Sequence, residues 1–322
     1  MSFQHRDKCK RIFTFWEPKE SMTPYLKLCL KTWERRLPQH KIIILNYTNL
    51  DQYIPLGTYD ISLLKKFKLM TQKDAVMVAV LEEHGGIFMD ADTIALGDLN
   101  PIVSRLDETE AVMFGTHCAF IAARPGSYLL KLWRKAIQDK MLCVSNGGQN
   151  VKDLSWDFFA NSALESAMNE IIMSNQFVSA IQKYTVDNWA CYLKEKTKKD
   201  KVATFRGREL LHRISNSVLA GKRNLLFSTV YKRYLTMLDR VEYGFIPEAK
   251  YSKSKLMDPQ EKYQQFWFAN KCDIKNVFMD KQSVIGLHHS WTPQWYKDFS
   301  EKDVLEHDCL LSKTLKYLTD DI

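Results

Sequence analysis

Short apolar runs and amphipathic stretches alternate along the first 125 residues of the chain. Several of the runs are rich in β-branched or aromatic residues, which is typical of buried strands. They span residues 11–16, 41–45, 87–89, 111–114 and 119–123. Between the first two runs, apolar side chains repeat at helical spacing from Leu26 to Leu37, and Pro38 follows. A strand, a helix and a strand within about 35 residues predict a right-handed crossover and hence a parallel sheet.

Another helical stretch, residues 74–84, is followed by two consecutive glycines, which supply the positive φ angles that a helix C-terminus needs. The apolar run 87–89 comes next and leads to two carboxylates, Asp90 and Asp92. Since alternate residues of an extended segment point the same way, both carboxylates can face one site. Like charges this close are relieved by a shared proton or a bound cation, and aspartate oxygens suit magnesium or manganese. The alternative is a solvated acidic turn, which the buried strand before it disfavours.

This order of helix, double glycine, apolar triplet and Asp-x-Asp resembles the metal-binding signature of GT-A fold glycosyltransferases. It is most similar to the capsular polysaccharide synthesis type, which is related to the Och1-like sugar transferases. Asp74 matches a helical aspartate of that family, whereas Met77 stands where the family usually has an arginine. The resemblance implies an α/β fold, a GT-A (Rossmann-like) mostly parallel sheet flanked by helices, with a helical subdomain on the acceptor side.

The resemblance also implies a division of the chain into three regions. Residues 1–150 are expected to form the GT-A core that binds the nucleotide sugar, and residues 151–275 a helical, variable acceptor-side region. Residues 276–322 are expected to return to the donor site. Charged helical patterns without recognisable chemistry run from residue 182 to about 263, and a terminal helix is predicted from Asp303 to Leu318.

Two further segments are expected to border the site, because ligands of parallel sheets bind beyond the carboxyl ends of the strands. Phe15 and Trp16 resemble the family's opening I-x-x-x-W segment, and Trp16 either stacks on the nucleotide base or fills the core. Near the other end, an apolar strand leads to His288, His289 and Trp291. This segment resembles a shortened form of the family's closing H-x-x-G-S-W motif. One of the two histidines is therefore expected to complete the metal shell or to touch the diphosphate.

The resemblance implies a role for each of these residues. Asp92 is expected to bind Mn²⁺ or Mg²⁺ directly, and Asp90 to act through the ribose or a metal-bound water, which makes both catalytic. The expected metal ligands are Asp90, Asp92, His288 and His289. The residues expected to bind the nucleotide sugar are Phe15, Trp16, Asp74, Asp90, Ala91, His289 and Trp291.

The implied activity is the metal-dependent, retaining transfer of a sugar from a nucleotide-diphosphate donor, a UDP-sugar. The implied acceptor is a hydroxyl of a bacterial surface polysaccharide, capsule or lipooligosaccharide, so the expected partners are the donor and a saccharide or glycolipid. A divalent ion is needed because breaking the anomeric bond leaves charge on the β-phosphate. No protein nucleophile is assigned.

Two other classes of function compete with this prediction. An apolar strand followed by D-x-D-x-T is also typical of HAD-type phosphatases, in which Asp90 would be the nucleophile. That superfamily needs a late acidic pair, and the late pair here is Asp320-Asp321 at the extreme C-terminus. A noncatalytic sugar-binding protein with a degenerate site would lack the paired carboxylates, whereas this chain has both of them.

The composition adds expectations about location and partners. A net charge of +8 and a basic run at residues 194–201 fit either a solvated surface or peripheral contact with an anionic membrane. Nucleic acid is not expected, because neither zinc-ligand spacing nor an RNA-binding signature accompanies the run. No apolar run reaches the roughly 18 residues of a membrane span, and the seven cysteines form no C-x-x-C pair. We therefore expect a cytoplasmic protein with reduced thiols, located in part at the inner face of the cell membrane.

Overall fold

The computed structural model describes residues 10–173, 233–251, 257–269 and 273–320. Its main feature is a sheet of six strands in the order β2-β1-β3-β6-β5-β7. The strands are β1 Arg11–Phe15, β2 Lys41–Leu45, β3 Gly86–Met89, β5 Ala111–Phe114, β6 His117–Ala123 and β7 Leu235–Leu238. Only β6 runs antiparallel to its neighbours, so the predicted mostly parallel α/β sheet is confirmed.

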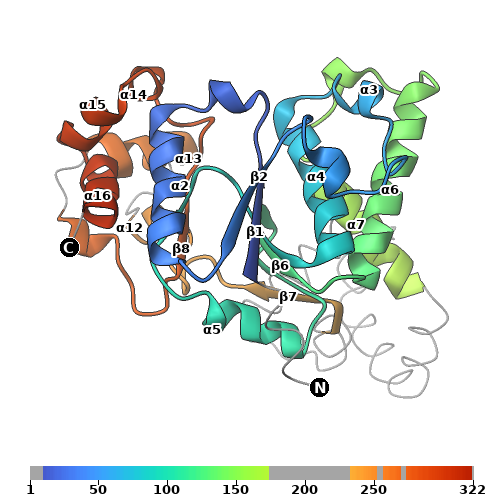
Figure 1. Cartoon of the computed structure of the whole chain (residues 1–322), viewed down its shortest axis with the longest axis horizontal. Helices are drawn as coiled ribbons and strands as arrows, with labels where there is room; N and C mark the ends of the chain where they lie inside the picture. Colours follow the sequence, from blue (N-terminus) through green and yellow to red (C-terminus); the bar gives the residue numbers. More distant parts are fainter. Residues whose placement is uncertain (1–9, 174–232, 252–256, 270–272, 321–322) are drawn as a thin grey trace, which may run out of the picture.

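Helices cover both faces of this sheet (Figure 1). One face packs against α4 Leu69–His84, α6 Tyr128–Ser145 and α7 Asn161–Met173. The other packs against α2 Pro24–Arg36, α15 Glu301–Glu306 and α16 Leu310–Thr319. Shorter helices are α3 Ile61–Leu64, α5 Asn100–Val103, α12 Glu248–Tyr251, α13 Pro259–Gln264 and α14 Gln294–Lys297.

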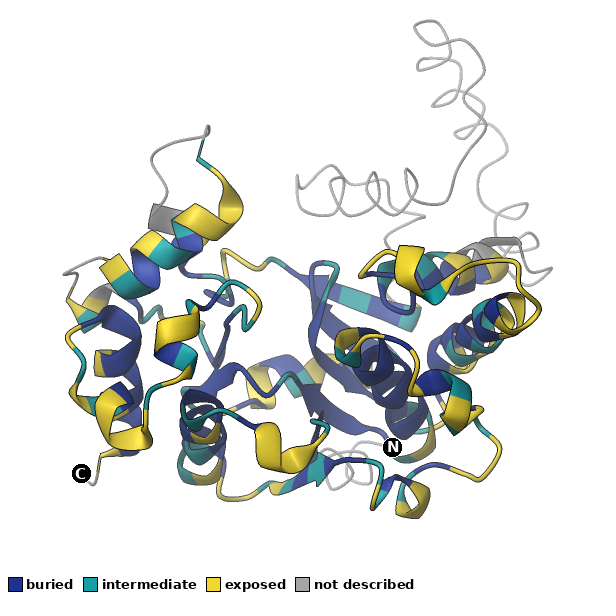
Figure 2. Ribbon diagram, turned by 90° about the horizontal axis from the view of Figure 1, so that it is seen from above, coloured by how far each residue is buried: buried dark blue, intermediate teal, exposed yellow. Residues whose placement is uncertain are grey.

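The alternation of side chains along the strands explains the two cores. Phe13 and Phe88 are fully buried in the core on the α4 side of the sheet. Their neighbours Ile12 and Ile87 are fully buried in the core on the α2 side, because successive residues of a strand point to opposite faces. A sheet covered on both faces has strands that are apolar at nearly every position. Figure 2 shows the strands buried and the outer helix faces exposed.

A second, two-stranded sheet joins distant parts of the chain. It pairs β4 Thr93–Ala95 antiparallel with β8 Val284–Gly286, so that Thr93 lies opposite Gly286. The indole Nε1 of Trp33, on α2, donates a hydrogen bond of 2.6 Å to the Thr93 carbonyl oxygen. These contacts bring the segment after β8 to the end of β3.

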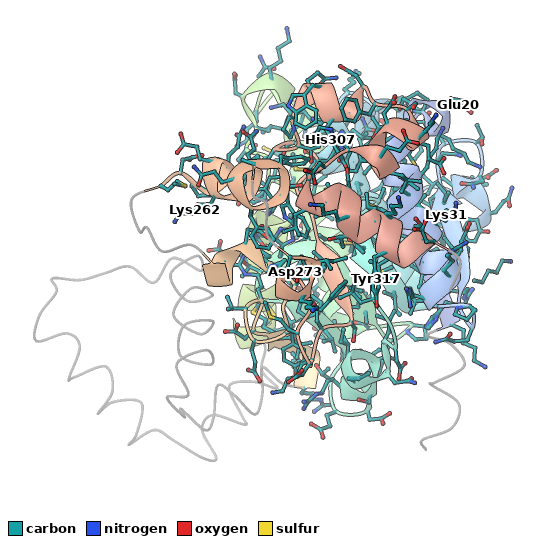
Figure 3. The ribbon with its side chains drawn as sticks, turned by 90° about the vertical axis from the view of Figure 1, so that its left-hand side faces the viewer. Glu20, Lys31, Lys262, Asp273, His307 and Tyr317 are labelled. Carbon is teal, nitrogen blue, oxygen red and sulfur yellow. The ribbon has the colours of Figure 1, made fainter. Side chains whose placement is uncertain are left out.

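Two secondary-structure predictions were wrong. The single helix expected from Asp303 to Leu318 is divided into α15 and α16, because His307 and Cys309 have extended backbone angles between them (Figure 3). Within the predicted helical stretch 182–263, Leu235–Leu238 is the strand β7, which pairs in parallel with β5. Pairing with an existing sheet edge outweighs the local helical pattern there.

Some predictions concern residues that are not described. The basic run 194–201 and the helical patterns up to residue 232 lie outside the described ranges, so the membrane contact and the three-region division stay predictions. In the described ranges, no helix combines the length and the hydrophobicity that crossing a membrane requires. The described cysteines, Cys29, Cys118, Cys143 and Cys309, carry free thiols.

Candidate active site

A buried lysine joins two of the predicted site carboxylates. The Nζ atom of Lys73, in the first turns of α4, lies 2.9 Å from Asp74 Oδ1. The same atom lies 2.9 Å from Asp90 Oδ1 and 3.2 Å from Asp90 Oδ2. Asp90 directly follows β3, and its backbone nitrogen donates a hydrogen bond to the Ala119 carbonyl oxygen. The helix thus supplies the cation and the strand end supplies the carboxylate.

Asp92 is held from a different side. Its Oδ2 atom accepts a 2.7 Å hydrogen bond from the backbone N–H of His289, in the segment that follows β8. Its carbonyl oxygen accepts another, of 3.2 Å, from the backbone N–H of Leu287. The two carboxylates are therefore held by different parts of the chain: Asp90 by α4, and Asp92 by the C-terminal segment.

The site holds more negative charge than its lysine can balance. Burial, followed by the repulsion of Asp90, raises the pKa of Asp92 to about 7. Burial also raises the pKa of Asp74 to about 6, despite the opposing effect of the Lys73 ammonium. Burial disfavours the Lys73 ammonium itself, but Asp74 and Asp90 outweigh that effect and raise the pKa of Lys73 well above its ordinary value. One ammonium faces three carboxylates, so a further cation is favoured there.

The two predicted histidines have different surroundings. Tyr25 Oη and His289 Nδ1 are 2.5 Å apart, and the two rings are stacked with centroids 5.7 Å apart. His288 instead packs against Trp291, with ring centroids 4.0 Å apart, and against Tyr263. Burial lowers the pKa of each histidine to about 4, so both imidazoles are neutral near pH 7. Of the two, only His289 is hydrogen-bonded to Asp92 in the described residues, and it uses its backbone.

Trp16, in the segment after β1, lies beside the residues that hold Asp92. Trp16 is half-buried, its ring lies edge-on to His289 at 5.3 Å, and its Nε1 donates to Ser21 Oγ. Phe15 points into the core on the α4 side and packs edge-on against Tyr47. Trp16, rather than Phe15, thus has its ring beside the residues that hold Asp92. Ala91, between the two aspartates, is buried.

A divalent ion fits this donor set only if it takes few ligands from the protein. In the described ranges, no group of three or more His, Cys, Asp or Glu side chains is arranged to hold a metal ion. Mg²⁺ is commonly bound through one or two carboxylates, with water and substrate phosphates completing its shell. Two neighbouring carboxylates with excess negative charge meet that requirement, so Asp92 and Asp90 fit the ion. Ligation by His288 or His289 stays a prediction.

Two residues of the site were not predicted from the sequence. Lys73 is one of many lysines in the chain, and only its burial against two carboxylates distinguishes it. Tyr25 looks like an ordinary apolar position of α2, and its contact with His289 spans 264 residues of sequence. The one local signal for Lys73 was its position directly before Asp74, the aspartate that matches the motif.

A buried carboxyl group outside the motif lies near Tyr263. Glu248 is 6% exposed, and it interacts electrostatically with Tyr263, which packs against His288. Burial raises the pKa of Glu248 to about 7, although the Trp267 indole favours its charged form. The folded chain thus holds this proton at pH values where the unfolded chain has released it.

Glu248→Gln should therefore change how stability depends on pH. The raised pKa stabilises the wild type below about pH 4.5, and this contribution is lost as the pH rises through about 7. The stability of Glu248→Gln relative to wild type should thus increase by about 3 kcal/mol across that window. Urea unfolding at about pH 4, 5.5 and 7.5 measures it, with the exposed Glu261→Gln as the control. A pH-independent difference would contradict the burial argument.

Comparison with known proteins gives one family match. Residues 1–140 match the family described as "Capsular polysaccharide synthesis protein", which is less than half of the 322-residue chain. No curated protein matches. Among solved structures, "PaToxG Glycosyltransferase" is similar at 16% identity, covering 66% of this chain and 86% of that chain, with a TM-score of 0.35. A TM-score this low supports no conclusion about the fold, which is therefore judged from the strand order and the contacts.

Proposed function

We propose that this chain is a metal-dependent glycosyltransferase of polysaccharide synthesis. The carrying observation is the pair Asp90 and Asp92, which share a site with excess negative charge at the carboxyl end of β3. Both residues lie in the segment 1–140 that matches the capsular polysaccharide synthesis family. The strand order also supports a GT-A type of fold, because β1, β2 and β3 are parallel and their carboxyl ends share one edge.

The donor is proposed to be a nucleotide-diphosphate sugar, of which a UDP-sugar is the first to test. Trp16 lies at the carboxyl end of β1 and next to His289, where its ring can stack on a base. The backbone N–H of His289 orients Asp92, and Tyr25 fixes the imidazole ring. When bound at Asp92, with Asp90 acting through the ribose or a metal-bound water, a divalent ion would supply Lewis-acid stabilisation of the leaving diphosphate.

The acceptor is proposed to be a hydroxyl of a capsule, lipooligosaccharide or other surface polysaccharide. This proposal follows the name of the matched family and the resemblance described above. Retention of the anomeric configuration is part of the same proposal, and no side chain is assigned as a nucleophile. A cytoplasmic location, with contact at the inner membrane face, would place the chain beside a glycolipid acceptor.

Nucleotide release tests the proposed donor chemistry. The full chain is incubated with Mn²⁺ and a panel of UDP-, GDP-, ADP- and CMP-sugars, and the released nucleotide is quantified. We expect slow release of UDP from one donor, and a loss of about 100-fold or more when EDTA removes the ion. Phosphate release from monoesters, without nucleotide turnover, would instead favour the phosphatase. No turnover of any substrate, together with no Mn²⁺-dependent binding of a uridine nucleotide, would refute the transferase.

A further inference from the structure

The cation of this site comes from an unexpected position of α4. The resemblance places an arginine at the position of Met77, but Met77 is fully buried in the apolar core on the α4 side. Lys73 lies four residues earlier, and residues four apart share one face of a helix. Lys73 therefore brings a positive charge to the site from a position one turn before Met77.

The contacts of Lys73 go beyond an ordinary ion pair. Lys73 is only 9% exposed, and its ammonium contacts both oxygens of Asp90 and one of Asp74. Within the described residues, neither carboxylate has another ion-pair partner. A buried charge is tolerated only when its partners are well placed, so each member of this triad fixes the others.

We propose that Lys73 is a positioning residue that gives the two motif carboxylates, Asp90 and Asp92, different roles. This inference rests on the proposed function. Its ammonium holds Asp90 against Asp74 and keeps the oxygens of Asp90 from closing on a divalent ion. Asp92, oriented from the other side by the His289 N–H, is then the carboxylate presented to that ion. Asp90 remains at the site as an oriented acceptor for a hydroxyl of the donor.

The proposal predicts an unusual combination of effects for Lys73→Met. Removing the ammonium takes a positive charge away and releases two carboxylate oxygens, so Mn²⁺ should bind about tenfold more tightly. Catalysis should nevertheless fall, because Asp90 loses its orientation, and we expect kcat/KM for the donor to drop about 100-fold. A lysine that only stabilised the fold would produce no gain in Mn²⁺ affinity.

The experiment measures Mn²⁺ binding to the nucleotide-free chain by electron paramagnetic resonance, together with donor turnover. Lys68→Met is the matched control, since it removes the same charge from an exposed position just before α4. Lys73→Arg keeps the cation and should stay within about threefold of the wild-type Mn²⁺ affinity. Equal Mn²⁺ affinities in Lys73→Met and the wild type would overturn the proposal.

A folding defect would not prevent the test. Lys73→Met/Asp74→Asn replaces both members of the buried pair with neutral side chains, which avoids an uncompensated charge. This double variant should bind Mn²⁺ about tenfold more tightly than Asp74→Asn alone, and equal binding would overturn the proposal. The two hypotheses fail differently: a wild type without donor turnover counts against the transferase. A wild type with turnover, but with no gain in Mn²⁺ affinity on loss of Lys73, counts against Lys73 alone.

Discussion

Asp92→Asn is expected to lower metal-dependent nucleotide release by about 10²- to 10³-fold. The amide has the shape of the carboxylate, and its oxygen can still accept the hydrogen bond from the His289 backbone N–H. The substitution thus leaves the segment after β8 in place and removes a negative charge that a divalent ion needs. Release of the nucleotide is measured at saturating donor with Mn²⁺ varied, which separates weaker ion binding from slower chemistry.

An exposed aspartate serves as the control for this variant. Asp107→Asn changes the net charge equally but lies on the surface, so it should keep wild-type turnover. Because burial and Asp90 raise the pKa of Asp92, its replacement should leave the fold intact or stabilise it. Thermal unfolding of Asp92→Asn checks this point. Intact turnover in Asp92→Asn would show that Asp92 does not bind the ion.

Gly85→Ala is expected to destabilise the fold by about 3 kcal/mol or more. Gly85 ends α4 with a φ angle of +61°, which L-residues rarely adopt. A Cβ atom there would lie 2.5 Å from both Cδ and the backbone nitrogen of Pro125. The clash is with a rigid ring and with backbone, so α4 or the turn before α6 would have to move. Urea unfolding of Gly85→Ala and of the wild type measures the difference in their free energies of unfolding.

Gly57→Ala separates the two contributions to this cost. Gly57 has a φ angle of +82°, but a Cβ atom there would meet nothing within 4 Å. Gly57→Ala should therefore lower the free energy of unfolding only by the backbone strain, which is about 1 to 2 kcal/mol. Equal losses for the two variants would mean that Pro125 yields easily. The double glycine would then be a requirement of backbone conformation alone.

The positions of most strands, though not of β4 and β7, followed from local pattern. Residues 41–45 and 111–114 are strands with the predicted bounds, because a sheet covered on both faces needs apolar side chains at successive positions. The strand β7 escaped prediction, since Leu235–Leu238 is short and its pairing partner, β5, lies more than 100 residues away. Local pattern carries no information about such a partner.

The helix predicted from Asp303 to Leu318 failed for a related reason. Apolar spacing continues across the break, but Ser300 and Asp303 cap one helix and Cys309 begins another. The break lets α15 and α16 pack separately against α2, where Lys31 Nζ lies 3.8 Å from Glu301 Oε1. The spacing of apolar residues indicates which residues share a buried face, but it does not show whether they belong to one helix or to two.

By itself, the sequence determined that a helix, a glycine pair and a buried strand lead to two carboxylates. The prediction that Asp90 and Asp92 lie in an extended segment was wrong, because β3 ends at Met89 and the Thr93 N–H donates to the Asp90 carbonyl oxygen, which closes a turn. The helix, the glycine pair and the strand are local properties, fixed by the apolar pattern and by the φ angles that glycine allows. Only the tertiary structure decided which groups surround those carboxylates: Lys73 against Asp90, and the His289 backbone against Asp92. The balance of charge at the site depends on distances between residues far apart in sequence, and residue pattern does not contain those distances.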